Sequence, residues 1–298
     1  MIKRADLDEF ADDLLSQFWK SHRSDAPSTV YHYTSAEGLF GILESNSIWA
    51  TDCRFLNDAS ESQVGVAKAK EICRTRRFSQ TSAYLEEFYR QVLTVLGVES
   101  PEPNFVFSLS EREDDLTQWR TYANDGLGFT VGFSSANLLE NSQDNNAEFE
   151  FSKVYYLSRG QEKAVKDAFD EFEKFIKINK RRDFGGIAMT LDWVVSNYST
   201  LFKHSSFRSE REWRVNTYNL IDDEEERQSV KVRAKGGRLI PYIPLNLGKQ
   251  PHDRLPITRI GIGPSFKDAT IKYAVEKLCA QTGFEVEIYN ADSPYRRL

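Results

Sequence analysis

The sequence predicts an α+β fold, with a mixed, largely antiparallel β-sheet and helical insertions. Strand patterns are scattered among helical ones without a steady strand–helix alternation, which disfavours a doubly wound parallel sheet. The chain has 298 residues, 40% of them hydrophobic, enough to bury a large core. Its 16 glycines and 9 prolines are too few for a fibrous or linker-dominated protein. Because no segment reads as a linker, we expect residues 1–298 to form a single domain.

The first hundred residues predict helices around two short extended segments. Apolar residues at helical spacing, with Asp6 and Glu9 as a capping box, predict a helix over about residues 5–20. A strand over Val30–Thr34, a helix over Ala36–Glu44 and an extended segment over Ser47–Thr51 are expected next. Amphipathic helices over Glu61–Arg74 and Ser82–Leu96 then form a first helical insertion, about residues 60–97.

The rest of the chain alternates between strands and a second helical insertion. The central elements expected are a strand over Phe105–Leu109, a short helix over Leu116–Tyr122, a strand over Gly128–Phe133, a loop over Glu140–Asn146 and a strand over Glu148–Leu157. The second insertion, about residues 159–203, contains two helices. The last elements expected are strands over Glu212–Leu220, Val230–Val232, Arg238–Ile243 and Ile257–Ile262, a helix over Lys267–Thr282 and a strand over Glu285–Tyr289. The acidic run Asp222–Glu226 is expected to be a solvated hairpin tip.

Charge and cysteine content exclude several classes of protein. With 39 basic and 45 acidic residues the formal charge is −6, which argues against a non-specific nucleic-acid coat but not against a local basic cleft. The three cysteines are far apart and form no CxxC pair, so neither a disulfide scaffold nor a cysteine zinc site is predicted. No apolar run approaches a membrane span, and the N-terminus lacks the apolar core of a secretory signal. We therefore expect a cytoplasmic protein.

Common catalytic signatures, such as GxGxxG, GxxxxGK[ST], HExxH and GxSxG, are absent from the sequence. The four histidines do not pair at metal-ligand spacing, so no metal is expected. The segment Gly261–Pro264 is interpreted as a tight turn, since a lone GxG is weak evidence for a phosphate site. Three clusters of polar and aromatic residues remain as candidates.

The first cluster is Val30–Ser35, in which His32 and Thr34 point to one face of a strand and Tyr31 and Tyr33 to the other. A histidine beside hydroxyl groups can hold a sugar hydroxyl or a phosphate. The alternative is a half-buried strand in which His32 is merely hydrogen-bonded.

The second cluster joins the strand that contains Ser108 to the short helix after it. Trp119 and Tyr122 are three residues apart and share a helix face, with Arg120 between them as a candidate phosphate ligand. The alternative is aromatic core packing, with Arg120 on the surface.

The third cluster is Lys203–Arg214. Glu210 and Glu212 are two apart, so on a strand both carboxylates would face one side and repel unless a cation compensates. Such a pair suits polarising a ribose hydroxyl and stabilising an oxocarbenium-like centre. The alternative is ordinary salt bridges to Arg211 and Arg214 at a strand edge.

Together the clusters resemble a bacterial family catalogued as a domain of unknown function, DUF2971. The matching stretches are YHYTS, IWATDCRFLNDASE, FSLSE with QWRTYA, EREWR, IGIGP and the closing SPYR. They run from residue 30 to the C-terminus, so the resemblance covers most of the chain. As an ordered set these motifs are specific, although singly none of them is.

The arrangement is also similar to the ADP-ribosyltransferase superfamily, which implies a split β-sheet and NAD as the substrate. By resemblance, Glu212 is catalytic and Glu210 engages the acceptor. Tyr122 or Trp119 would stack on nicotinamide, and Arg120 would meet the pyrophosphate. The full set of NAD-binding residues implied is His32, Tyr33, Thr34, Ser108, Trp119, Arg120 and Tyr122.

The resemblance therefore implies an ADP-ribosyltransferase that needs no metal and modifies a protein or a nucleic acid. It also implies a bacterial toxin or anti-phage effector, with a regulatory or antitoxin protein as a partner. Three alternatives stay open: a sensor that binds a nucleotide without turning it over, a metal-dependent defence nuclease, and an interaction protein whose aromatic clusters are all core.

Overall fold

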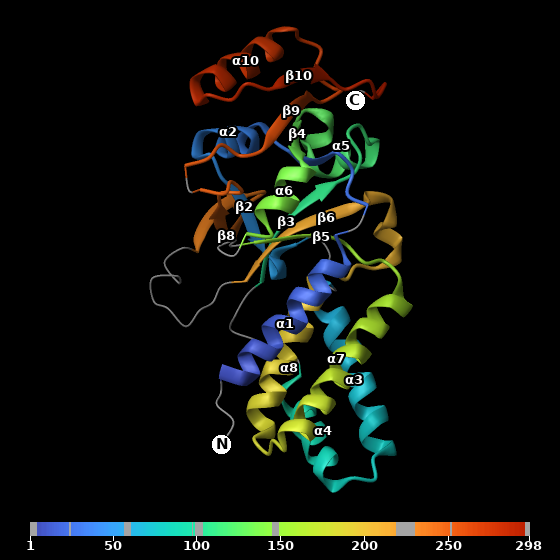
Figure 1. Ribbon diagram of the computed structural model, residues 1–298. Coiled ribbons are helices and arrows are strands. Elements are labelled where there is room, and N and C mark those ends of the chain that lie inside the picture. The colour runs from blue at the N-terminus through green and yellow to red at the C-terminus, as the bar shows by residue number, and fades with distance from the viewer. Residues whose placement is uncertain are drawn as a thin grey trace.

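Figure 1 shows an elongated molecule with a β-sheet in one half and a helical bundle in the other. The computed structural model describes residues 5–23, 25–56, 61–96, 98, 104–144, 149–218, 230–250 and 252–295. The strands are β1 (Thr29–Thr34), β2 (Ile48–Asp52), β3 (Asn104–Ser110), β4 (Phe129–Ser134), β5 (Glu150–Lys153), β6 (Glu212–Tyr218), β7 (Lys231–Lys235), β8 (Arg238–Leu245), β9 (Ile257–Ile262) and β10 (Glu287–Asn290). The helices are α1 (Ala5–Ser21), α2 (Ala36–Ser45), α3 (Glu61–Ser79), α4 (Ala83–Val95), α5 (Leu116–Tyr122), α6 (Ser135–Asn141), α7 (Ser158–Asn179), α8 (Phe184–Ser199) and α10 (Thr270–Thr282). Short 3₁₀ turns cover Cys53–Phe55, Asn124–Gly126 and Ser205–Glu210.

The sheet is mixed and largely antiparallel, as the sequence predicted. Its strands follow the order β10-β9-β4-β1-β3-β2-β8-β7, with β6 on the other edge of β3 and β5 beyond β6. Among these strands only β9 and β10 pair in parallel. The parallel pair is joined through α10, the crossover that such a pair requires.

The sheet splits along one edge of β3, which β1 and β2 share. Strand β1 pairs with β3 only at Tyr31 opposite Ser110, whereas β2 pairs with the other end of β3, at Val106 and Phe105. Between these points the edge of β3 around Ser108 has no strand partner among the described residues. The split leaves backbone groups of β3 accessible to side chains from β1.

Two hydrophobic clusters fill the two halves. One lies between the sheet and helices α2, α6 and α10, and includes Leu39, Leu138 and Val275. The other joins α1, α3, α4, α7 and α8, and includes Phe18 and Phe202. These five helices are the predicted N-terminal helix and the two predicted insertions, which are confirmed as helical.

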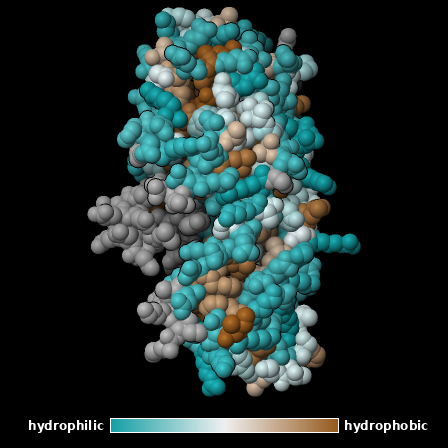
Figure 2. Space-filling model, in the orientation of Figure 1, coloured by the Kyte–Doolittle hydropathy of each residue, from teal (hydrophilic) through white to brown (hydrophobic). Residues whose placement is uncertain are grey.

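Three further features concern the surface, the cysteines and the helices. The face shown in Figure 2 is mostly hydrophilic, with small hydrophobic areas. In the part of the chain that the structure describes, Cys53, Cys73 and Cys279 form no disulfide bond. In the described part of the chain, no helix is both long enough and apolar enough to cross a membrane.

Some predicted boundaries are wrong for local reasons. The predicted loop Glu140–Asn146 begins inside α6. The Ser134 hydroxyl accepts the Asn137 amide and caps this helix, which was not predicted because its sequence is polar. The predicted strand Glu148–Leu157 is confirmed only over β5, since Tyr155 instead forms an isolated bridge with Phe202. The acidic run at 222–226 lies outside the described residues.

The segment Gly261–Pro264 makes a close backbone approach, which favours the tight-turn interpretation. The amide of Gly263 donates to the carbonyl of Gly128 at 2.9 Å. A β-carbon on Gly263 would lie 2.3 Å from the carbonyl oxygen of Gly126. Because that amide is already bonded to protein, it is not free to bind a phosphate.

This approach predicts that Gly263→Ala destabilises the protein. The added methyl meets a backbone carbonyl that cannot turn away, so we expect a loss of about 1–3 kcal/mol in the free energy of unfolding. Urea denaturation measures this loss. Gly185→Ala in α8 is the matched control, since nothing lies within 4 Å of its β-carbon. Equal stability of the two variants would contradict the prediction.

Candidate functional site

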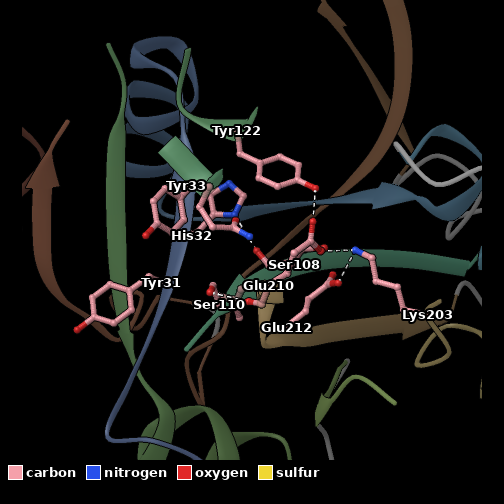
Figure 3. Close-up of a pocket in the computed structure, with 11 residues that line it drawn as sticks. Tyr31, His32, Tyr33, Ser108, Ser110, Tyr122, Lys203, Glu210 and Glu212 are labelled. Carbon is pink, nitrogen blue, oxygen red and sulfur yellow. Dashed lines mark hydrogen bonds and ion pairs between the residues drawn. The ribbon is translucent and has the colours of Figure 1, made fainter. Parts of the chain in front are cut away.

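A cavity opens beside the split between β1 and β3, and all three sequence clusters contribute to it. Its free volume is about 80 Å³. Figure 3 shows Tyr122, Glu210, Glu212 and Lys203 converging, with His32 and Ser108 beside them, whereas the hydroxyl of Tyr31 points away. The lining residues are Tyr31, His32, Tyr33, Ser108, Leu109, Ser110, Gln118, Tyr122, Lys203, Glu210 and Glu212.

The two glutamates meet at Lys203, and only Glu212 lies on a strand. Glu210 ends a 3₁₀ turn, Arg211 is left-handed with φ 45°, and Glu212 begins β6. The ammonium of Lys203 lies 2.6 Å from Glu210 Oε2 and 2.7 Å from Glu212 Oε2 (Figure 3). A shared cation therefore brings the carboxylates together.

Glu212 is also held by Arg214 from the opposite side. Arg214 Nε lies 2.7 Å from Glu212 Oε1, and its Nη1 donates to the carbonyl of Thr200 at 2.5 Å. The side chains of Glu212 and Arg214 are only 5% and 1% exposed. The predicted strand-edge salt bridge to Arg214 is therefore a buried ion network, whereas Arg211 is largely exposed and 3.8 Å from Glu111.

This network keeps Glu212 ionised. Burial by itself would raise the pKa of Glu212, but the charges of Arg214 and Lys203 outweigh burial and lower the pKa to about 2. Two adjacent carboxylates were expected to require a cation, and two cations, Lys203 and Arg214, contact Glu212. At neutral pH the cavity therefore contains a carboxylate that accepts hydrogen bonds.

Three hydroxyl groups hold the glutamate segment in place. The Tyr122 hydroxyl donates to Glu210 Oε1 at 3.0 Å, and the Ser110 hydroxyl donates to the Glu210 carbonyl at 2.8 Å. The amide of Glu212 donates to the Tyr156 hydroxyl at 2.9 Å. Burial and the nearby Glu210 raise the pKa of Tyr122 to about 12, so its hydroxyl remains a donor at physiological pH.

His32 fills the split in the sheet. Its Nδ1 lies 2.9 Å from the carbonyl of Ser108, which can only accept, so Nδ1 carries the proton. The ring stacks on Phe107, with centroids 4.1 Å apart. Burial lowers the pKa of His32 to about 3, so the imidazole is neutral and Nε2 is an acceptor. The hydrogen bond to the backbone agrees with the alternative interpretation of His32, and the residue also lines the cavity.

Four other predicted residues are placed less favourably. Tyr33 lines the cavity, but its hydroxyl already donates to the Arg112 carbonyl and accepts the Asp115 amide. Thr34 is buried and does not line the cavity.

Trp119 and Arg120 also lie outside the cavity lining. Trp119 is fully buried, and its Nε1 donates to Asp114 at 2.6 Å. Arg120 is 62% exposed and lies near Asp125 and Tyr295. Both placements agree with the alternative of core packing with Arg120 on the surface, and of the predicted stacking residues only Tyr122 lines the cavity.

Among the polar residues that line the cavity or hold the glutamate segment, sequence reasoning missed Lys203, Gln118, Ser110 and Tyr156. Lys203 had a signal, because two carboxylates close together require a cation and it begins the same cluster. Gln118 is buried and lines the cavity, but glutamine has no diagnostic pattern. Tyr156 follows β5 and reaches Glu212 only through the fold. Within the described ranges, no group of three or more His, Cys, Asp or Glu residues is arranged to hold a metal ion.

Comparison with known proteins gives a family match over about a third of the chain. Residues 118–215 match the family described as "Protein of unknown function (DUF2971)". The match extends from within α5 into β6, and so includes Tyr122, Lys203, Glu210 and Glu212. The DUF2971 resemblance expected from the motifs is thus confirmed over these residues. Neither a curated protein nor a solved structure matches the chain significantly.

The buried network predicts that Lys203→Met is strongly destabilising. Removing the ammonium leaves two buried carboxylates without their shared cation, which we expect to cost about 3–5 kcal/mol in the free energy of unfolding. Chemical denaturation at neutral pH measures this change. Arg208→Met, a nearby exposed position, should cost much less. A similar loss in both variants would mean that the network contributes little.

The lowered pKa of Glu212 predicts a specific pH dependence. The folded-state pKa of about 2 is below the ordinary value of 4.5, so this group stabilises the protein above pH 4.5 and the stabilisation is lost as pH falls toward 2. We expect the stability difference between wild type and Glu212→Gln to shrink by about 3 kcal/mol over that interval. Urea denaturation across the interval measures it. A constant difference would contradict the assignment.

Proposed function

We propose that this protein is an NAD-dependent ADP-ribosyltransferase-like enzyme. The observation that carries the proposal is the meeting of His32, Ser108 and Glu212 in one cavity beside the split between β1 and β3. The resemblance requires a hydroxyl or aromatic side chain on a middle strand. Ser108 and Ser110 supply hydroxyls on β3, whereas Trp119 lies on a short helix. A split sheet that carries histidine, serine and glutamate in this order supports the ADP-ribosyltransferase-like type of fold.

The cavity offers hydrogen-bond acceptors that suit a ribose. Glu212 is ionised, and His32 is neutral with Nε2 as an acceptor, so each can accept a hydrogen bond from a ribose hydroxyl. A free volume of about 80 Å³ accommodates only part of a dinucleotide. The remainder of NAD would have to extend out of the cavity.

The chemistry would follow from charge development. The bond between the ribose C1′ and the nicotinamide nitrogen breaks, and nicotinamide leaves with the electron pair. The carboxylate of Glu212 stabilises the oxocarbenium that remains. An acceptor hydroxyl, amine or base nitrogen then attacks C1′, and Glu210 takes the proton that the acceptor loses. Tyr122, bonded to Glu210, would both orient that carboxylate and lie against the nicotinamide ring.

A sensor that binds a nucleotide without turnover is the second candidate, and one observation favours it. Both carboxylate oxygens of Glu212 already contact cations, Lys203 and Arg214. A neutralised carboxylate stabilises an oxocarbenium less well, so turnover requires Lys203 to move toward Glu210 or away. A role as a bacterial toxin or anti-phage effector rests on the family resemblance alone.

The enzyme proposal predicts release of nicotinamide from NAD by the wild-type protein. Glu212→Gln should reduce the rate by about a hundredfold or more, because the amide cannot stabilise the cationic centre. Labelled NAD incubated with a cell lysate measures nicotinamide release and label transfer together. Glu285→Gln, an exposed position on another part of the molecule, is the control for loss of one carboxylate.

The outcomes separate the two candidates. Release by wild type and by Glu285→Gln, but not by folded Glu212→Gln, supports the transferase. Binding of NAD without release by any of the three proteins supports the sensor. If none of the three proteins binds NAD or releases nicotinamide, both candidates are overturned.

A further inference from the structure

A second, larger cavity lies behind the glutamate segment. It is a groove of about 690 Å³ lined by residues that follow β3, by the segment around β5 and by the segment before β6. Ser209 and Arg211 line this groove, whereas Glu210 and Glu212 line the cavity described above. The two spaces therefore share the segment 209–212 as a wall.

The groove is strongly basic in a chain whose formal charge is −6. Its lining contains four cations, Arg112, Lys153, Arg208 and Arg211, but only one carboxylate, Glu111. Glu111 is shared between Lys153 at 2.5 Å and Arg211 at 3.8 Å. Arg112 also lies 3.4 Å from Asp115, which is outside the lining, so two carboxylates face four cations and the groove retains a positive field that favours an anionic ligand.

The cations are accessible and come from separate segments. The side chains of Arg112, Lys153 and Arg211 are 43%, 39% and 57% exposed. Arg208 is exposed as well, and contacts no carboxylate in the described part of the chain. Cations spread over several segments suit a row of phosphates better than a single phosphate group.

Aromatic rings line the same groove. Tyr155 and Tyr156 are half-buried, and Tyr155 packs edge-on against His22, with ring centroids 4.5 Å apart. Burial lowers the pKa of His22, which leaves a neutral ring at physiological pH. Partly exposed aromatic rings beside a basic track are the combination that binds unpaired bases by stacking.

We propose that this groove binds single-stranded nucleic acid, with the phosphates along the four cations and bases against the tyrosines. Tyr156 connects the groove to the glutamate segment, because its hydroxyl accepts the amide of Glu212. A strand in the groove therefore lies across a single backbone segment from Glu212. The role of this strand as the acceptor rests on the proposed function, whereas its binding does not.

The test is binding of labelled single-stranded DNA and RNA of about 12 nucleotides to the full chain, measured by fluorescence anisotropy without NAD. Raising salt from about 50 to 200 mM should weaken binding steeply, since phosphate contacts release counterions. The double variant Arg208→Gln/Arg211→Gln should lower affinity on the order of tenfold. It should also reduce the slope of log affinity against log salt by about 1.4, because each arginine neutralises one phosphate and each such contact to a single strand contributes about 0.7.

The matched control is Lys267→Gln/Lys272→Gln. It removes the same charge from exposed positions at and before α10, at the far end of the molecule (Figure 1). We expect its affinity and salt dependence to equal those of wild type. Circular dichroism confirms that each variant is folded.

Four results would overturn the proposal: no binding at low salt, equal weakening in the control, a paired duplex that binds as tightly as the single strand, or a phosphorylated peptide that binds more tightly. Nicotinamide release is measured separately on the same preparations. Strand binding by a protein that fails to cleave NAD would leave this inference standing while the proposed function fails. Cleavage of NAD without strand binding would support the proposed function and overturn this inference.

Discussion

The ion network centred on Lys203 is the interaction on which the rest of the site depends. Lys203 follows α8, and its ammonium bridges Glu210 and Glu212 at the start of β6. Arg214 reaches back from β6 to the carbonyl of Thr200 at the end of α8. These contacts join the helical half to the sheet half at the point where the cavity lies. Removing one member of such a buried network leaves an uncompensated charge in the protein interior, which is strongly destabilising.

The split in the sheet is the second constraint. A β-strand with an unpaired edge must satisfy its backbone groups elsewhere, and here the carbonyl of Ser108 is bonded by the imidazole of His32. That bond fixes the tautomer and places the ring against Phe107, so a structural requirement of the sheet also determines the chemistry of His32. The hydrogen bond to Ser108 therefore explains both why His32 fills the split and why it lines the cavity.

The left-handed residue Arg211 separates two chemical environments. A non-glycine residue with φ 45° costs about 1 kcal/mol or more, and here it turns the chain between a 3₁₀ turn and β6. Glu210 and Glu212 consequently line the acidic cavity, while Ser209 and Arg211 line the basic groove. The proposed transferase site and the proposed strand-binding groove would therefore lie on the two sides of a single segment.

By itself the sequence determined most element types, the largely antiparallel sheet, the helical insertions and the three clusters, because periodicity and turn residues are local signals. Glu210, Glu212, His32, Ser108 and Tyr122 were singled out by residue type and by the family resemblance, and they line one cavity. Only the tertiary structure decided that Trp119 is core, that Arg120 lies outside, and that Lys203, Gln118 and Tyr156 belong to the site. The physical reason is that burial and ion pairing are non-local. Whether a tryptophan packs or stacks on a ligand depends on which strand lies opposite it, and no spacing along the chain records that.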